Sequence, residues 1–105
     1  MPDHVVALTT TPTQEEAESL AHLMLEQRLA ACVQISQPIR SIYRWQGEVC
    51  TDEEWQLWIK TAADRVDALT AWLPDHHSED CPELVVLPIV DGSPDYLAWV
   101  TDETR

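Results

Sequence analysis

Residues 39–59 read IRSIYRWQGEVCTDEEWQLWI, and this stretch predicts a long β-hairpin. Gly47 lies between two extended arms, where a glycine suits a tight two-residue turn. Counting outward from that turn gives the cross-strand pairs Trp45–Glu48, Tyr43–Cys50 and Arg40–Glu53. Each arm can extend for about ten residues, whereas ordinary strands have about five or six. We therefore expect the hairpin to extend beyond its own subunit and to need a further partner.

A strand and a helix are predicted before the hairpin. Residues 4–11 are rich in apolar and β-branched side chains, which favour a strand. Thr13 can then cap a helix by accepting a hydrogen bond from the amide of Glu16, whose carboxylate can reach back to the cap. Apolar residues at helical spacing continue this helix to an expected end near Arg28 or Leu29.

The segments after the hairpin predict a second helix, a strand and a last short helix. Asp64 offers an N-cap for the second helix, and Pro74 marks where it should stop or bend. Residues 84–90 favour a strand, and residues 95–101 favour a short C-terminal helix. The order strand, helix, strand, strand, helix, strand predicts an α+β ferredoxin-like (βαββαβ) sandwich, with residues 1–105 forming one domain.

This predicted topology leaves one face of the sheet uncovered. Right-handed crossovers place both helices on the same face. No internal repeat or linker in the sequence supplies a second layer. We therefore expect copies of the chain to associate through the open face.

Composition narrows the possible partners. The formal charge of −13 would repel nucleic acid and concentrate cations near the protein, but a solvated acidic surface that keeps the protein soluble is the simpler explanation of this charge. The apolar run Leu84–Leu87 is far too short to span a membrane, and the first residues resemble no signal sequence. The three cysteines form no CxxC pair, which argues against a zinc ribbon. We expect a cytoplasmic protein that binds neither membrane nor nucleic acid.

Several ordered blocks of the sequence resemble the CutA divalent-cation-tolerance family. The blocks are LAACV at 29–33, SIYRWQG at 41–47, IKT at 59–61, PEL at 82–84, LPI at 87–89 and PDYLAW at 94–99. This resemblance implies a ferredoxin-like subunit of a tight homotrimer, a long hairpin packed on neighbouring subunits, and a link to copper and other divalent cations. It also implies metal-associated roles for His76 and His77 and a ligand role for Cys32.

The sequence departs from the family pattern at two places. Residues 77–80 read HSED where family members commonly have His-Pro-Tyr-Glu. Thr9 stands where copper-binding members have a cysteine, and a hydroxyl is a poor copper ligand.

Residues 75–81 contain the densest set of metal-ligand side chains. His76 and His77 are followed by Glu79 and Asp80, and imidazoles and carboxylates suit copper or zinc. Adjacent histidines point apart on a helix or strand, so a shared ion requires a bent loop or a neighbouring subunit. The alternative is a polar loop with ordinary surface histidines. Cys32 has its own alternative, because a buried thiol packs as a small apolar group.

A second candidate site is a cleft between subunits. Its expected residues combine aromatic rings with two cations suited to a small anion: Tyr43, Arg44, Trp45, Lys60 and Trp99. A packing seam between subunits is the alternative. By analogy of fold, the alternative function is a PII-like signalling trimer that binds a small molecule or anion in such clefts. With only two glycines and no recognised catalytic motif, the chain is not expected to be an enzyme or to bind a nucleotide or organic cofactor.

Overall fold

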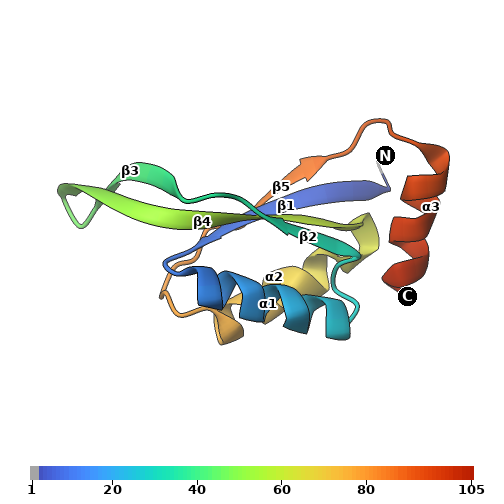
Figure 1. Cartoon of the computed structure of the whole chain (residues 1–105), viewed down its shortest axis with the longest axis horizontal. Helices are drawn as coiled ribbons and strands as arrows, with labels where there is room; N and C mark the ends of the chain where they lie inside the picture. The colour runs from blue at the N-terminus through green and yellow to red at the C-terminus, as the bar shows by residue number, and fades with distance from the viewer. Residues whose placement is uncertain (1–2) are drawn as a thin grey trace.

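The computed structural model describes residues 3–105 and shows the predicted α+β fold, with one antiparallel sheet. The elements in chain order are β1 (His4–Thr11), α1 (Gln14–Glu26), β2 (Cys32–Ile35), β3 (Ile39–Trp45), β4 (Glu48–Ala62), the 3₁₀ turn η1 (Ala63–Arg65), α2 (Val66–His76), β5 (Val85–Pro88) and α3 (Pro94–Glu103). The strand order is β2-β4-β1-β5, and β3 pairs with the outer part of β4. Helices α1 and α2 lie on the same side of the sheet, and α3 lies at the end away from the hairpin (Figure 1).

The hairpin has the register that the sequence predicts. Trp45 lies opposite Glu48, Tyr43 opposite Cys50 and Arg40 opposite Glu53. Gln46 and Gly47 both have positive φ angles, 51° and 84°, which is the backbone of a two-residue turn matched to strand twist. Strand β4 has 15 residues, and only its second half pairs with β1 and β2. The hairpin therefore projects from the body of the chain, and the extents including the hairpin are 44 × 26 × 24 Å (Figure 1).

Several predicted boundaries differ from the structure. Helix α1 ends at Glu26, because Arg28 adopts a left-handed φ of 56° and stops the helix before its predicted end. The capping prediction for Asp64 is wrong, because η1 provides the first turn and no side chain caps α2. Pro74 lies inside α2, which continues to His76.

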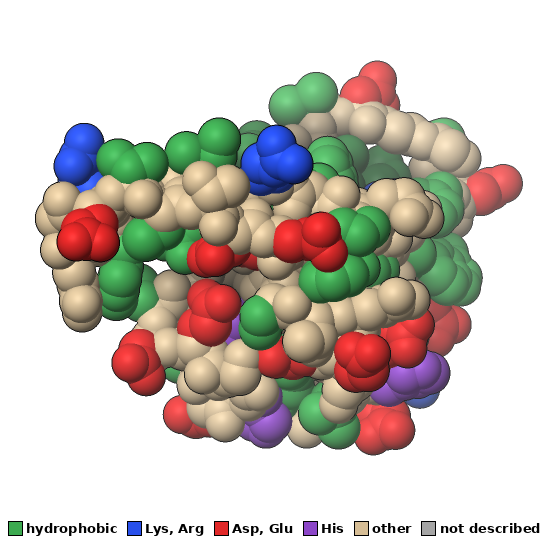
Figure 2. Space-filling view, turned by 60° about the vertical axis from the view of Figure 1, so that its left-hand side comes forward, with side chains coloured by type: hydrophobic (Ala, Val, Ile, Leu, Met, Phe, Trp, Pro, Cys, Tyr) green, Lys and Arg blue, Asp and Glu red, His purple; other side chains and the backbone are tan. Residues whose placement is uncertain are grey.

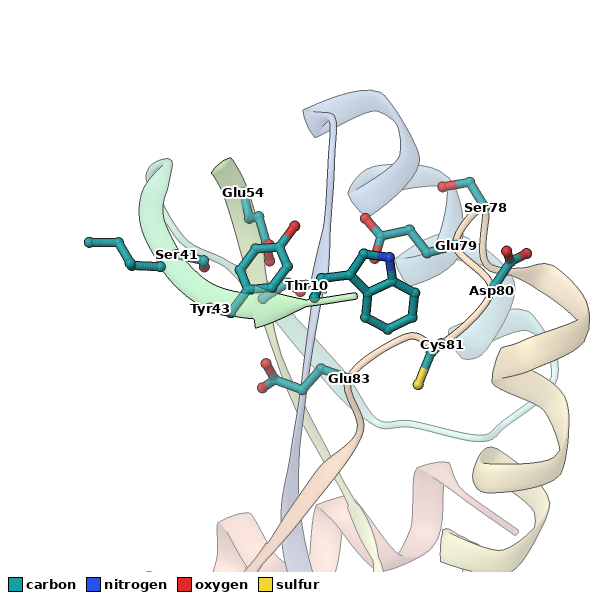
Figure 3. A pocket seen from close by; sticks show the side chains of 11 residues that line it. Thr10, Ser41, Tyr43, Glu54, Ser78, Glu79, Asp80, Cys81 and Glu83 are labelled. Atoms are coloured by element: carbon teal, nitrogen blue, oxygen red, sulfur yellow. The ribbon is translucent and has the colours of Figure 1, made fainter. Parts of the chain in front are cut away.

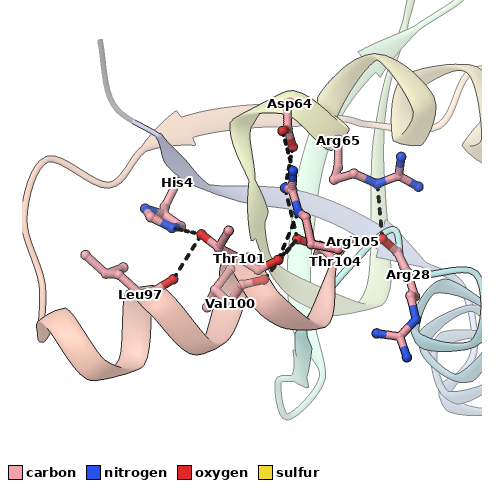
Figure 4. Close-up of polar contacts among 9 residues, drawn as sticks. All are labelled: His4, Arg28, Asp64, Arg65, Leu97, Val100, Thr101, Thr104 and Arg105. Carbon is pink, nitrogen blue, oxygen red and sulfur yellow. Dashed lines mark hydrogen bonds and ion pairs between the residues drawn. The ribbon is translucent and has the colours of Figure 1, made fainter.

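Asp64 instead fixes the C-terminus of the chain. The Arg105 guanidinium donates to both Asp64 carboxylate oxygens at 2.7 Å (Figure 4), and this contact lowers the pKa of Asp64. The Thr101 hydroxyl is hydrogen-bonded to His4 Nε2 at 2.8 Å. These contacts hold α3 against η1 and the start of β1.

The apolar core lies between the sheet and the two helices. Its largest fully buried members are Met24 from α1, Leu57 and Ile59 from β4, and Leu69 and Leu73 from α2. The opposite face stays open. Trp58 lies between Leu57 and Ile59 in the chain, points the other way and is 40% exposed. Within residues 3–105, only α3 contacts this face, at the end where His4 meets Thr101 and Lys60 lies near Tyr96, and the rest has no helix over it (Figure 1).

Thr9 places a hydroxyl inside the core. The residue is completely buried, and its Oγ1 has no hydrogen-bond partner among residues 3–105. Thr9→Val is therefore expected to raise the free energy of unfolding by about 1 kcal/mol, because it removes an unsatisfied polar group at nearly constant shape. Urea denaturation at fixed protein concentration measures this change.

Thr101→Val is the matched control, because the Thr101 hydroxyl contacts both His4 Nε2 and the Leu97 carbonyl. This control is expected to lose stability. A Thr9→Val variant that loses as much stability as the control would contradict the assignment of an unpaired hydroxyl.

Candidate functional site

His77 is held inside the loop that follows α2. Its side chain is fully buried, and Nε2 lies 2.7 Å from the Thr10 carbonyl, so Nε2 carries the proton and donates it. Nδ1 accepts a hydrogen bond from the Glu79 amide at 3.0 Å. Both ring nitrogens are therefore occupied, and His77 has no free lone pair for a metal in this conformation.

His76 has the opposite arrangement. Its Nδ1 lies 2.8 Å from the Trp72 carbonyl and must be the donor, so the neutral ring has its lone pair on Nε2. The ring stacks on Trp72 with 4.2 Å between centroids, and the residue is exposed to solvent. Metal-binding histidines commonly have this arrangement, with the second nitrogen bonded to a carbonyl. His76 can therefore act as a ligand, whereas His77 holds the loop.

Glu16 completes the attachment of the loop. Its carboxylate accepts hydrogen bonds from the Ser78 amide at 3.0 Å and the Ser78 hydroxyl at 2.7 Å. Thr13 caps α1 as predicted, accepting from the Glu16 amide at 3.1 Å. The predicted return contact of the Glu16 carboxylate to the cap is wrong, because that carboxylate binds the loop.

A cavity of about 670 Å³ lies between the hairpin and this loop (Figure 3). The lining residues are Thr10, Ser41, Ile42, Tyr43, Trp45, Glu54, Ser78, Glu79, Asp80, Cys81 and Glu83. Tyr43 and Ser41 come from β3, Glu54 from β4, and Glu79, Asp80 and Cys81 from the loop (Figure 3). Aromatic rings and carboxylates therefore share one concave surface.

Two carboxyl groups of this cavity have raised pKa values. Burial raises the pKa of Glu79, and the nearby Glu54 raises it further, while His77 acts against these effects. Burial and then Glu54 also raise the pKa of Glu83. The Tyr43 hydroxyl donates to Asp52, and this bond is the main cause that raises the pKa of Tyr43 to about 12. Among residues 3–105, no lysine or arginine lines the cavity, so the site favours a cation.

The five residues predicted to line a cleft between subunits do not lie together within one chain. Tyr43 and Trp45 line the cavity. Arg44 alternates with them and points from the other face of β3. Lys60 donates to Gln34 Oε1 and lies 6.0 Å from the centroid of Tyr96, a residue that the sequence analysis missed. Trp99 accompanies Tyr96, with 5.5 Å between ring centroids.

The residues predicted as metal ligands also lie at different places in the structure. Cys32 lies opposite Lys60 in the β2–β4 pairing, at the other end of the sheet from the loop. Glu79 and Asp80 line the cavity, whereas His76 does not. Within the described residues, no group of three or more His, Cys, Asp or Glu side chains could hold a metal ion.

Glu54 and Glu83 also line the cavity but were not predicted as site residues from the sequence. The predicted register could have found Glu54, because residues 50, 52 and 54 share a face with Tyr43. No pattern in the sequence predicts the position of Glu83, because the path of the loop in the folded chain brings this residue to the cavity.

The CutA1 divalent ion tolerance protein family model matches residues 5–103. The chain belongs to the CutA family. It is 42% identical to the divalent-cation tolerance protein CutA of Thermus thermophilus, over 94% of this chain and 96% of that protein. It is 40% identical to a chloroplastic CutA of Arabidopsis thaliana, over 96% of this chain and 56% of that protein. The crystal structure of rice CutA1 matches with a TM-score of 0.95 and 40% identity, covering 99% of this chain and 95% of that one.

Membership in the CutA family confirms the resemblance seen in the sequence blocks. The relatives and structures described here support CutA and give no support to the PII-like alternative. No helix among residues 3–105 is long and apolar enough to cross a membrane.

Proposed function

We propose that this protein is a cytoplasmic CutA homotrimer of ferredoxin-like subunits that binds copper or another divalent cation and acts in metal homeostasis. The role is binding and not catalysis. The family model and the name of the Thermus relative support the link to divalent cations. The observation that carries the metal proposal is that His76 is exposed and engages only its Nδ1, with the Trp72 carbonyl, which leaves Nε2 available to a metal ion.

The open sheet face supports assembly. Trp58, Leu8 and Val85 form one row across β4, β1 and β5, and Lys60, Val6 and Leu87 form the next. Trp58, Val85 and Leu87 are 40–45% exposed. An apolar face of this kind on a small domain is typical of an interface. Three copies that cover one another's faces would remove it from water.

His76 supplies one protein ligand per chain in this proposal. Its imidazole suits copper or zinc, and water or groups from other subunits complete the coordination shell. Figure 2 shows red carboxylates spread over one face of the molecule, with blue basic groups mainly along its upper edge. This acidic surface raises the concentration of cations near the protein. Binding through one such ligand is weaker than binding in a preformed structural site.

His76→Ala is expected to weaken copper(II) or zinc binding by about tenfold or more, because it removes the ligand whose tautomer is fixed. Isothermal titration with each metal salt measures the affinity. His22→Ala is the matched control, since His22 is an exposed histidine on α1. The control is expected to bind as the wild type does. Equal affinities for the wild type and His76→Ala would contradict the metal proposal.

A further inference from the structure

Arg44 is a cation for which residues 3–105 supply no hydrogen-bond or ion-pair partner. Residues 3–105 contain all six lysines and arginines. Arg28, Lys60, Arg65 and Arg105 each contact a carboxylate, an amide oxygen or a carbonyl. The remaining two arginines, Arg40 and Arg44, lie on β3.

The two hairpin arginines differ in what lies across the ladder. Arg40 lies opposite Glu53, whereas Arg44 lies opposite Val49. Arg44 is exposed near the tip of the hairpin, and no hydrogen bond or ion pair involves it within the described part of the chain. A charged group on an arm that extends beyond its subunit is available to a neighbouring molecule.

The cavity between the hairpin and the loop has chemistry that suits a guanidinium group. Tyr43 and Trp45 offer aromatic faces, and Glu54, Glu79 and Glu83 offer carboxylates. A guanidinium is planar, weakly hydrated, able to stack on aromatic rings and able to bind carboxylates through two N–H groups. The carboxylates stand around a space of about 670 Å³ and form no metal-holding group, so a larger cation fits better than a bare ion.

Arg44 cannot fill the cavity of its own chain. Tyr43, Trp45 and also Ile42 line the cavity from β3, whereas Arg44, near the hairpin tip, is exposed and is not among the lining residues. The donor and the acceptor surface are thus two different surfaces of one molecule. Contacts of this kind join copies head to tail and close into a ring when the rotation between copies permits.

We propose that Arg44 of a second copy of this chain inserts its guanidinium into the cavity between the hairpin and the loop, where it meets Glu54 and Glu83. This contact requires the homotrimer proposed above and names the residues that meet in it. It supplies the positive charge that the cavity lacks. It also gives the projecting hairpin a defined seat on the next subunit.

Charge reversal and its restoration test the contact. Arg44→Glu and Glu83→Arg are each expected to raise the concentration at which the trimer dissociates by about tenfold or more, because each places like charges together. The double variant, Arg44→Glu with Glu83→Arg, is expected to recover most of the loss. Sedimentation velocity over a dilution series measures the dissociation of the trimer for both single variants and the double variant. Glu83→Gln, a milder change, tests the same side of the contact if Glu83→Arg fails to fold.

Arg44→Gln and Arg40→Gln form a matched control pair, because each removes one hairpin cation without placing like charges together, and only Arg44→Gln is expected to weaken the trimer. A trimer that tolerates Arg44→Gln as well as Arg40→Gln would overturn the contact while the homotrimer stands. A double variant as weak as the single variants would overturn direct pairing of Arg44 with Glu83. Stabilisation of the Arg44→Ala trimer by free agmatine, with dissociation otherwise unchanged, would assign the cavity to a small organic cation. A wild type that is monomeric would overturn the homotrimer and the contact together.

Discussion

Trp58→Glu is expected to release the chain as a monomer at micromolar concentration. Trp58 lies in the row of the open face that also contains Leu8 and Val85, and it is 40% exposed in the isolated chain. Burying a large apolar side chain stabilises an interface by about 1.5–3 kcal/mol. Glutamate loses that contribution and adds an unpaired charge that must be desolvated. Light scattering after size-exclusion chromatography measures the mass.

Trp58→Phe is the control for this substitution. It keeps a smaller apolar ring at the same position and loses the indole N–H, which donates to the Gln56 side chain at 3.1 Å. This variant is expected to remain trimeric. A Trp58→Glu chain that keeps the mass of the wild-type assembly on dilution would show that the open face is not the interface.

His77→Ala is expected to lower the free energy of unfolding by about 2–4 kcal/mol. The substitution leaves a cavity at a fully buried position and removes the partners of the Thr10 carbonyl and the Glu79 amide. It also frees the loop that forms one wall of the acidic cavity. Urea denaturation and hydrogen exchange of residues 78–83 measure the two effects.

The adjacent His76→Ala variant serves as the control. His76 is exposed and contributes a stacking contact with Trp72 and one hydrogen bond, so its loss is expected to cost about 1 kcal/mol. Similar losses of stability in the two variants would contradict the division into a structural His77 and an available His76.

The fold was predictable where local signals agree with one another. The turn at Gly47 sets the hairpin register, and Thr13 sets the start of α1, because both depend on residues close in sequence. Asp64 failed as a predicted cap because its carboxylate binds Arg105, which lies 41 residues away. A local capping rule contains no information about such a distant partner.

The roles of the two histidines could not be separated from the sequence. Both are imidazoles in one polar segment, and their difference depends on the Thr10 carbonyl, 67 residues from His77. The cavity is a similar case, since its loop residues meet the hairpin only in the folded chain. The resemblance to CutA identified the family, but the position of each candidate ligand required the structure.

Native mass spectrometry of the wild-type protein with copper(II) tests the central claim most directly. We predict an ion of three chain masses that takes up as many as three copper ions, one for each His76. A single-chain mass at low micromolar concentration would contradict the trimer. A three-chain mass with no more copper than the His76→Ala variant carries would contradict the metal-binding function.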